Sequence, residues 1–259
     1  MKHYNSPEVA EAYSQRIVDL VEGRRTMPAI TYDGDRSKTF HASDFDDGLC
    51  ILPAYYSRIL ENIPPLDFVS AQKFLRGRVI ERAIAEEEIP IVKDDIHCTI
   101  DDKNPDFGIA EIKSTTDSHE FFDIKERPYW VSRMKTYCFA SDNTKINLVV
   151  MFLAGNMASY LVWNIKNHND KVAYETSALD AWTFEFEQGE LEEHWKQILD
   201  RKETLEHALE KQTPFPKSWV EEFLPYSDRK SGRKYWQCEG CRYARDCYYY
   251  NEVILNART

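Results

Sequence analysis

Two acids and a lysine stand close together near the middle of the chain, in a segment whose pattern predicts a β-hairpin. Residues 108–113 (Gly-Ile-Ala-Glu-Ile-Lys) are short, apolar and bounded by turn-forming residues, which is typical of a strand. Side chains two apart on a strand share a face, so we expect Glu111 and Lys113 to point the same way. This pairing constrains the fold more than any other local pattern.

The partner strand is predicted from the run that ends at Asp101. Residues 96–101 (Ile-His-Cys-Thr-Ile-Asp) are mainly apolar and precede a turn region at 102–107 that contains Asn104-Pro105-Asp106. An antiparallel fold-back at that turn would bring Asp101 beside Glu111. Asp106 is the rival for the first acid, but only four residues separate it from Glu111, which makes juxtaposition on a hairpin difficult.

Two carboxylates that face each other in a partly buried place repel, so a cation should hold them. A hard dication with oxygen ligands, Mg²⁺ or Mn²⁺, suits this donor set. Such a metal lowers the pKa of its water and clamps a phosphate, and Lys113 beside it could orient that water. On this motif alone, a solvated hairpin with a cross-strand ion pair is an equally good interpretation.

Length and charge bound the class of protein. The chain has 259 residues and a net charge of −11, which argues against an indiscriminate coat on nucleic acid but leaves room for a basic groove. No apolar run reaches membrane-spanning length, and the first residues (Met-Lys-His-Tyr-Asn-Ser-Pro) lack an apolar signal core. We therefore expect a cytoplasmic protein that does not bind membranes.

The cysteine spacing indicates a second metal centre. Cys238, Cys241 and Cys247 form a Cys-x2-Cys-x5-Cys loop, and clustered thiols in a reducing compartment favour metal over disulfides. Thiolates suit either an iron–sulfur cluster or zinc, and the spacing does not separate the two. Cys98 and Cys138 lack such spacing, so we expect ordinary buried thiols there.

The remaining pattern predicts an α/β or α+β protein. We expect helices at residues 6–22, 68–88, 127–140 and 190–211, and a capped turn that leads into a helix at residues 43–61. We expect two further strands at residues 146–153 and 160–165.

The order of these motifs resembles the RecB-like branch of the PD-(D/E)XK nuclease superfamily. The ordered set consists of Gly77-x3-Glu81, Asp101, Glu111-Ile112-Lys113, Arg133-x3-Tyr137 and the C-terminal cysteines. It is most similar to stand-alone iron–sulfur exonucleases of the CRISPR-associated Cas-four type, including phage-type members. The similarity spans about residues 43–247, with Cys50 before Tyr55-Tyr56-Ser57-Arg58 matching the family's first cysteine.

The resemblance implies a fold, two cofactors and a site. The fold is a restriction-endonuclease-like α/β core of a mixed sheet flanked by helices, at residues 66–212, with residues 1–65 and 213–259 forming a helical and cluster-binding lid within one nuclease domain. A 4Fe-4S cluster would join the two ends of the chain through Cys50, Cys238, Cys241 and Cys247. Mg²⁺ or Mn²⁺ would sit on Glu81, Asp101, Glu111 and the Ile112 carbonyl.

Two departures from the family pattern concern catalysis. Glu81 stands where most RecB-like members have histidine; a carboxylate suits the same metals, and its alternative role is an ion pair with Arg78 or Arg82. Arg133 stands where the family has glutamine, one helical turn before Tyr137, so the two share a face. Arg133 could grip a phosphate or disturb Lys113.

The resemblance therefore implies a metal-dependent exodeoxyribonuclease, working with one or two metal ions on single-stranded DNA ends. Asp101, Glu111, Lys113, Tyr137 and Arg133 would be its catalytic residues. The alternatives are a DNA-end-binding accessory in spacer acquisition or recombination, and a zinc-stapled domain with no nucleic-acid role. Partners expected on the same basis are DNA, a second copy of the chain, and recombination or CRISPR-adaptation proteins.

Overall fold

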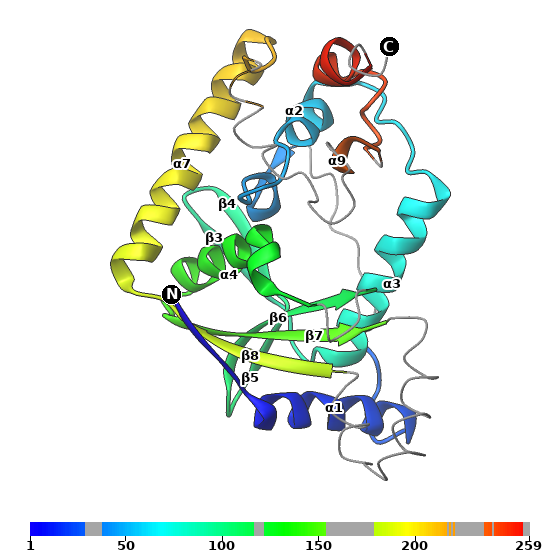
Figure 1. Ribbon diagram of the computed structural model, residues 1–259, viewed down its shortest axis with the longest axis vertical. Helices are drawn as coiled ribbons and strands as arrows, with labels where there is room; N and C mark the ends of the chain where they lie inside the picture. Colours follow the sequence, from blue (N-terminus) through cyan, green and yellow to red (C-terminus); the bar gives the residue numbers. More distant parts are fainter. Residues whose placement is uncertain are drawn as a thin grey trace.

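A mixed five-stranded sheet lies at the centre of the molecule (Figure 1). The structure is a computed structural model, which describes residues 1–28, 38–116, 122–153, 179–216, 218, 220, 236–239 and 241–255. The strand order is β1-β8-β7-β6-β5, with bounds Lys2–Asn5, Leu179–Glu185, Lys145–Phe152, Gly108–Thr115 and Asp102–Asn104. Strands β6 and β7 run parallel, and the other neighbours are antiparallel.

A second, three-stranded sheet continues from the first. Its order is β2-β4-β3, with bounds Phe40–His41, Ile96–Ile100 and Ile89–Lys93. Strand β4 pairs antiparallel with β3 and parallel with β2. The chain therefore leaves one sheet and enters the other at Asp101, where it bends.

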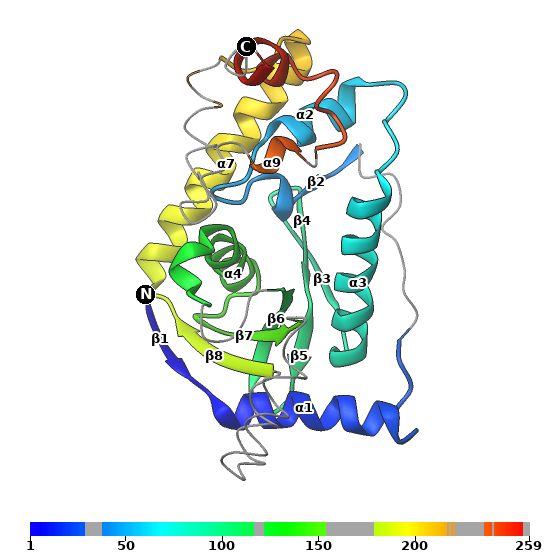
Figure 2. The same ribbon diagram turned by 45° about the vertical axis from the view of Figure 1, so that its right-hand side comes forward.

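Helices cover both faces of the five-stranded sheet (Figure 2). Helix α1 (Pro7–Val21) packs against β8, and α3 (Phe68–Ile84) packs against α1 and β6. Helix α4 (Pro128–Ala140) lies over β7 on the other face, and α7 (Gln188–Lys211) packs on α4. This arrangement confirms the α/β class with a mixed sheet between helices.

Short elements gather around α2 (Leu52–Ile59), above the second sheet in both ribbon views (Figures 1 and 2). They are the 3₁₀ helix Ala42–Asp44, helix α9 (Trp236–Glu239) and the π-helix Tyr250–Leu255, whereas the 3₁₀ helix Ile124–Glu126 contacts α4. Strand β1 and helix α1, which the sequence analysis grouped with the C-terminal segment, lie instead against the five-stranded sheet.

Side chains on the two faces of the central strands pack into two separate hydrophobic cores. On β6, Ala110 and Ile112 face α1 and join the smaller core, whereas Ile109 joins the larger core beneath α4 and α7. Because side chains alternate along a strand, Glu111 and Lys113 share the face of Ile109 and point towards α4. The side chains of Glu111 and Lys113 therefore lie on the side of the sheet that faces the larger core.

Several predicted elements are confirmed, and others need correction. The helices expected at 6–22, 127–140 and 190–211 and the strand at 146–153 match α1, α4, α7 and β7 within two residues at each end. The helix expected at 68–88 ends at Ile84, because the chain turns there into β3. The strand expected at 160–165 lies outside the described residues.

The predicted hairpin is shorter than expected. Strand β6 pairs with β5, in the register Asp102 opposite Ala110, whereas residues 96–100 belong to the other sheet. The register nevertheless places Asp101 at the level of Glu111. Within the described residues, no helix has the length and apolar character needed to cross a membrane.

Candidate carboxylate and thiol sites

Asp101 and Lys113 meet at the bend where β4 gives way to β5. The Asp101 carboxylate accepts a hydrogen bond from the Ile112 backbone amide at 2.8 Å, and the Lys113 Nζ lies 3.6 Å from Asp101 Oδ2. The same ammonium donates to the Ile112 carbonyl at 3.2 Å. The bend thus turns the acid towards the strand that carries Glu111.

Glu111 is fully buried and poorly satisfied. Lys113 contacts its Oε1 as an ion pair, whereas its Oε2 accepts no hydrogen bond from the described residues. A buried charge without hydrogen bonds costs free energy, so such groups in native proteins call for an explanation. Lys113 therefore connects two carboxylates, Asp101 and Glu111, from neighbouring strands.

Glu81 brings a third carboxylate to this site from α3. Asp101 and Glu111 lie close enough to raise its pKa, and Lys113 is close enough to lower it. The Glu81 side chain also forms the ion pair with Arg78 that the sequence suggested as its alternative role. The ion pair is thus confirmed, and the role of Glu81 as a metal ligand stays a prediction, since its carboxylate lies near the other two acids.

The electrostatics of the site follow from burial and like charge. Burial and the Asp101 carboxylate raise the pKa of both Glu111 and Glu81 to about 8. Burial lowers the pKa of Lys113, but Glu111 and Asp101 outweigh it, so the net shift is upwards. Three acids around one ammonium make a site that favours protons or cations.

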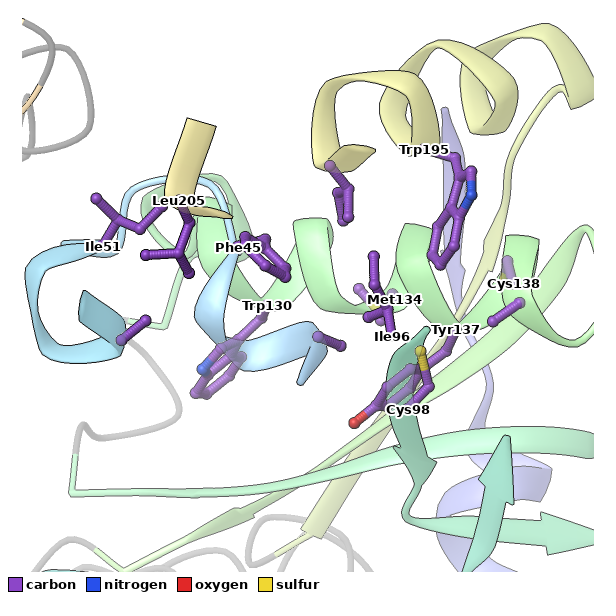
Figure 3. Close-up of a cluster of buried hydrophobic side chains, with 14 of the residues drawn as sticks. Phe45, Ile51, Ile96, Cys98, Trp130, Met134, Tyr137, Cys138, Trp195 and Leu205 are labelled. Carbon is purple, nitrogen blue, oxygen red and sulfur yellow. The ribbon is translucent and has the colours of Figure 1, made fainter. Parts of the chain in front are cut away.

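Arg133 and Tyr137 share a face of α4 above the strands, as the sequence predicts. The guanidinium carbon of Arg133 lies 5.9 Å from the Tyr137 ring centroid. Tyr137 is buried, and Figure 3 shows it projecting from α4 near Cys98 with its hydroxyl turned towards the strands. Burial and then Glu111 raise the pKa of Tyr137, so this phenol borders the carboxylate site.

Asp46 is a site residue that the sequence analysis missed. It is buried, and both of its oxygens accept from Arg133 Nε, at 2.9 and 3.1 Å. Burial raises the Asp46 pKa, and Arg133 opposes this shift. Arg133 is therefore held by a protein carboxylate as well as facing Glu111. Asp46 reaches the site only through its contact with Arg133, which is far away in the sequence. No local sequence pattern could therefore have identified it.

The rival acid, Asp106, lies elsewhere. It is exposed in the β5–β6 turn, where its backbone amide donates to the Asn104 side chain at 2.8 Å. Of the two candidates, only Asp101 lies with Glu111. Across the described part of the chain, no group of three or more histidine, cysteine, aspartate or glutamate side chains is arranged to hold a metal ion. At the carboxylates, the Lys113 ammonium stands between Asp101 and Glu111.

The four predicted cluster cysteines come together from both parts of the chain. Burial raises the pKa of Cys50, and the thiols of Cys238, Cys247 and Cys241 lie close enough to raise it further. The Cys50 amide donates to the Gln237 side chain at 2.7 Å, and Gln237 donates back to the Gly48 carbonyl at 2.6 Å. One side chain thus fastens the Cys50 loop to the Cys238 loop.

All six cysteines are free thiols, and the other two lie in the larger core. Cys98 and Cys138 are buried, and burial raises the pKa of each to about 12. This confirms the expectation of ordinary buried thiols. The segment before the cysteine loop is basic and aromatic in sequence and could line a strand-binding groove, but it lies outside the described residues (Arg229, Lys230, Arg233, Lys234 and Tyr235).

A short loop joins the two sites. Residues 46–50 begin with Asp46, which holds Arg133, and end with Cys50 among the thiols. Between them, Asp47 receives a hydrogen bond on its carboxylate from Arg201 of α7, and its amide donates to Ser132 of α4 at 2.9 Å. One short loop therefore contributes residues to both the thiol group and the surroundings of the carboxylate site.

Comparison with known proteins adds little to this geometry. No family model matches the sequence, and no curated protein matches it. A solved structure described as "Crystal structure of SSO0001" is 9% identical, over 93% of this chain and 96% of that chain, with a TM-score of 0.44. A likeness of this size supports no argument about fold family or activity, so the site itself must carry the functional reasoning.

Proposed function

We propose that this protein is a metal-dependent DNA exonuclease with a RecB-like, PD-(D/E)XK core that acts on single-stranded ends. The observation that carries the proposal is the meeting of Asp101 and Glu111 at Lys113, with Glu81 near enough to interact electrostatically with all three. Each acid comes from a separate element, so a shared site is not a by-product of local sequence. Buried like charges destabilise a fold unless a counter-ion or a function accounts for them.

The donor set fits a hard dication. Three carboxylates and the Ile112 carbonyl supply oxygen ligands only, which suits Mg²⁺ or Mn²⁺. Glu111 Oε2 accepts no hydrogen bond from the described residues, so its lone pairs are available to such an ion. When bound, the ion would supply a water of lowered pKa and neutralise charge on the scissile phosphate.

The protein's own residues would divide the remaining work. Lys113 would orient the attacking water and stabilise negative charge on the phosphate, because its ammonium already lies between the two acids. Tyr137 would border the substrate from α4. Arg133 would reach the same space, with its direction fixed by Asp46.

The cysteine group fits a soft metal centre, and we propose a 4Fe-4S cluster. The support is the convergence of four free thiols, one from residue 50 and three from the C-terminal loop. Zinc fits the same donors, so metal content decides between them. Iron in wild type that is lost in Cys50→Ser and retained in Cys138→Ser would support the cluster; zinc in its place would overturn it.

A DNA-end-binding accessory with weak cleavage is the second candidate. One observation favours it: Arg133 is paired with buried Asp46 and so is less available to a substrate phosphate. In such a protein the carboxylates would contribute little to turnover. This alternative would also suit a role in spacer acquisition or recombination.

Cleavage of a labelled single strand separates the two candidates. We expect Mg²⁺- or Mn²⁺-dependent cleavage by wild type, and its loss in Lys113→Ala and Glu111→Ala. Lys103→Ala is the matched control, because this lysine is exposed on β5. If neither Lys113→Ala nor Glu111→Ala changes cleavage, or if wild type binds strands without cutting them, the nuclease proposal fails.

A further inference from the structure

Arg78 lies on helix α3 at the border of the carboxylate site. It precedes Glu81 by three residues, so the two side chains are neighbours on the helix, and they form an ion pair. The same guanidinium nitrogen, Nη1, lies 3.2 Å from Oε1 of Glu88, in the chain between α3 and β3. One nitrogen therefore contacts two carboxylates, of which only Glu81 is a candidate metal ligand.

The charge of Arg78 also interacts with a second acid of the site. Burial lowers the pKa of Arg78, but Glu81, Glu88 and then Asp101 outweigh burial, so the net shift is upwards. An effect of Asp101 on this pKa means that the guanidinium lies within electrostatic range of Asp101. The Arg78 side chain is nevertheless 21% exposed, so solvent and ions reach it while it pairs with the acids.

Glu88 is held in place from the other side. Its Oε2 accepts a hydrogen bond from Arg82, which is buried, whereas its Oε1 faces Arg78. Arg82 thus anchors the Glu88 carboxylate beside the guanidinium of Arg78. Glu88 gives Arg78 a second ion-pair partner that lies outside the set of candidate metal ligands.

A dication at the carboxylates would compete with Arg78 for Glu81. Both cations require the same carboxylate, and like charges so close to each other repel. An arginine side chain stays protonated in proteins, so Arg78 cannot relieve the repulsion by losing a proton. It can relieve it by moving fully onto Glu88, because one of its nitrogens is already within ion-pair distance of that acid.

We propose that Arg78 is an exchangeable counter-ion of the metal site, which neutralises Glu81 until a dication displaces it onto Glu88. Arg78 is then a positioning residue, since it acts through Glu81 and not on the reacting atoms. Its ion pair orients the Glu81 carboxylate, and its departure makes that carboxylate available as the cation arrives. This inference rests on the proposed function for the dication alone, because it concerns metal affinity and does not require cleavage.

The test is titration of the full-length protein with Mn²⁺, followed by the electron paramagnetic resonance signal of the free ion. Arg78→Gln should bind Mn²⁺ about fivefold more tightly, because a competing cation is removed. Glu88→Gln should bind it about fivefold more weakly, because Arg78 then lacks the partner onto which it moves. Arg76→Gln is the matched control: this exposed arginine lies about 200° around α3 from Arg78, so affinity should stay within about twofold.

Two further variants separate the exchange from a general change in charge or folding. In the Arg78→Gln background, Glu88→Gln should alter affinity by less than about twofold, since no guanidinium remains to be moved. Both proteins with Glu88→Gln lack the partner of Arg82, so a defect in folding would weaken Mn²⁺ binding in both alike and would overturn the exchange. Arg78→Lys should restore affinity close to that of wild type, because a cation again pairs with Glu81.

The outcomes distinguish this inference from the nuclease proposal. Opposite shifts in Arg78→Gln and Glu88→Gln in a protein that never cleaves would sustain the exchange and overturn the nuclease. Cleavage by wild type, with Arg78→Gln binding Mn²⁺ as Arg76→Gln does, would overturn the exchange alone. Weaker binding in both Arg78→Gln and Glu88→Gln would show that the two residues only maintain the shape of the site, which also overturns the exchange.

Discussion

Two buried carboxylates lie next to each other in the sheet and differ in almost every contact. Asp102 accepts four hydrogen bonds, from the Tyr13 hydroxyl at 2.8 Å, from Arg16 at 2.6 Å, and from the amides of Glu86 and Glu87 at 2.7 and 3.1 Å. Glu111 contacts one ammonium, that of Lys113, and its Oε2 accepts no hydrogen bond from the described residues. Both side chains are fully buried.

The difference separates a structural acid from a functional one. Asp102 fastens α1 and the chain that follows α3 to β5, and its charge is satisfied by the protein itself. Glu111 is left with capacity to bind a cation, and burial together with Asp101 raises its pKa. A satisfied buried charge indicates architecture, whereas an unsatisfied one in a charged cluster indicates chemistry.

Replacing Glu111 gives the largest expected effect. Glu111→Gln should reduce the cleavage rate by about 10²–10³-fold, because a ligand and a charge at the reacting phosphate are lost. Its free energy of unfolding should not fall, since burial and Asp101 disfavour the charged form of Glu111 even with Lys113 beside it. Steady-state cleavage and urea unfolding measure the two quantities, and a destabilised but active variant would contradict the comparison.

Replacing Asp102 should give the reverse result. Asp102→Asn leaves Arg16 without its buried charge partner, so the free energy of unfolding should fall by about 3–5 kcal/mol. Cleavage by the folded fraction should change little. Asp106→Asn is the control, because an exposed acid in a turn should alter stability by less than about 0.5 kcal/mol. A stable but inactive Asp102→Asn protein would contradict this account.

Asp46 shares features with both Asp102 and Glu111, so it tests the distinction between a structural and a functional acid more sharply. It is satisfied by Arg133, like a structural acid, yet its partner also faces Glu111. We expect Asp46→Asn and Arg133→Gln to be coupled by about 1–3 kcal/mol in a double-mutant cycle on stability. The cycle on kcat/KM should show coupling as well; additive effects on cleavage would mean that Asp46 serves structure alone.

The pH dependence of metal-free stability is the smallest expected effect. The pKa of Glu111 and Glu81 rises from the usual 4.5 to about 8 in the fold, so the folded state holds more protons than the unfolded state between these values. Stability is then greatest below pH 4.5, as far as these two groups contribute, and declines as the pH rises to 8.

Thermal melts in EDTA across this range measure the effect, and Glu111→Gln should flatten the decline. Mn²⁺ competes with these protons, so it should raise the melting temperature more at pH 8 than at pH 5. An equal rise in melting temperature at pH 5 and at pH 8 would mean that Mn²⁺ binds somewhere other than these carboxylates.

The sequence predicts the parts of this site that local patterns control. Alternation fixes the shared face of Glu111 and Lys113 on β6, and the spacing of one helical turn fixes that of Arg133 and Tyr137 on α4. The position of the turn also predicts that Asp101 lies opposite Glu111. It does not predict that β4 pairs with β3 and β2 rather than with β6. The likeness of Cys50 to a fourth cluster ligand came from family resemblance, and the structure brings that thiol to the other three.

Long-range contacts produce what the sequence could not show. Asp46 acts through a residue 87 positions away, and Asp102 through residues 86 and 89 positions away. Strand β3 contains Pro90, which demotes a strand prediction, and it forms because the antiparallel partner β4 is available. Such roles depend on which helices and strands pack together in the fold. The helix or strand propensity of a local segment does not contain that information.

Calorimetric titration with Mn²⁺ tests the central claim most directly, because the claim is that the carboxylates around Lys113 form a cation site. Wild type should bind Mn²⁺, Asp101→Asn should bind it at least about tenfold more weakly, and Asp106→Asn should bind it as wild type does. Absence of binding by wild type, or equal weakening in the two variants, would contradict the account.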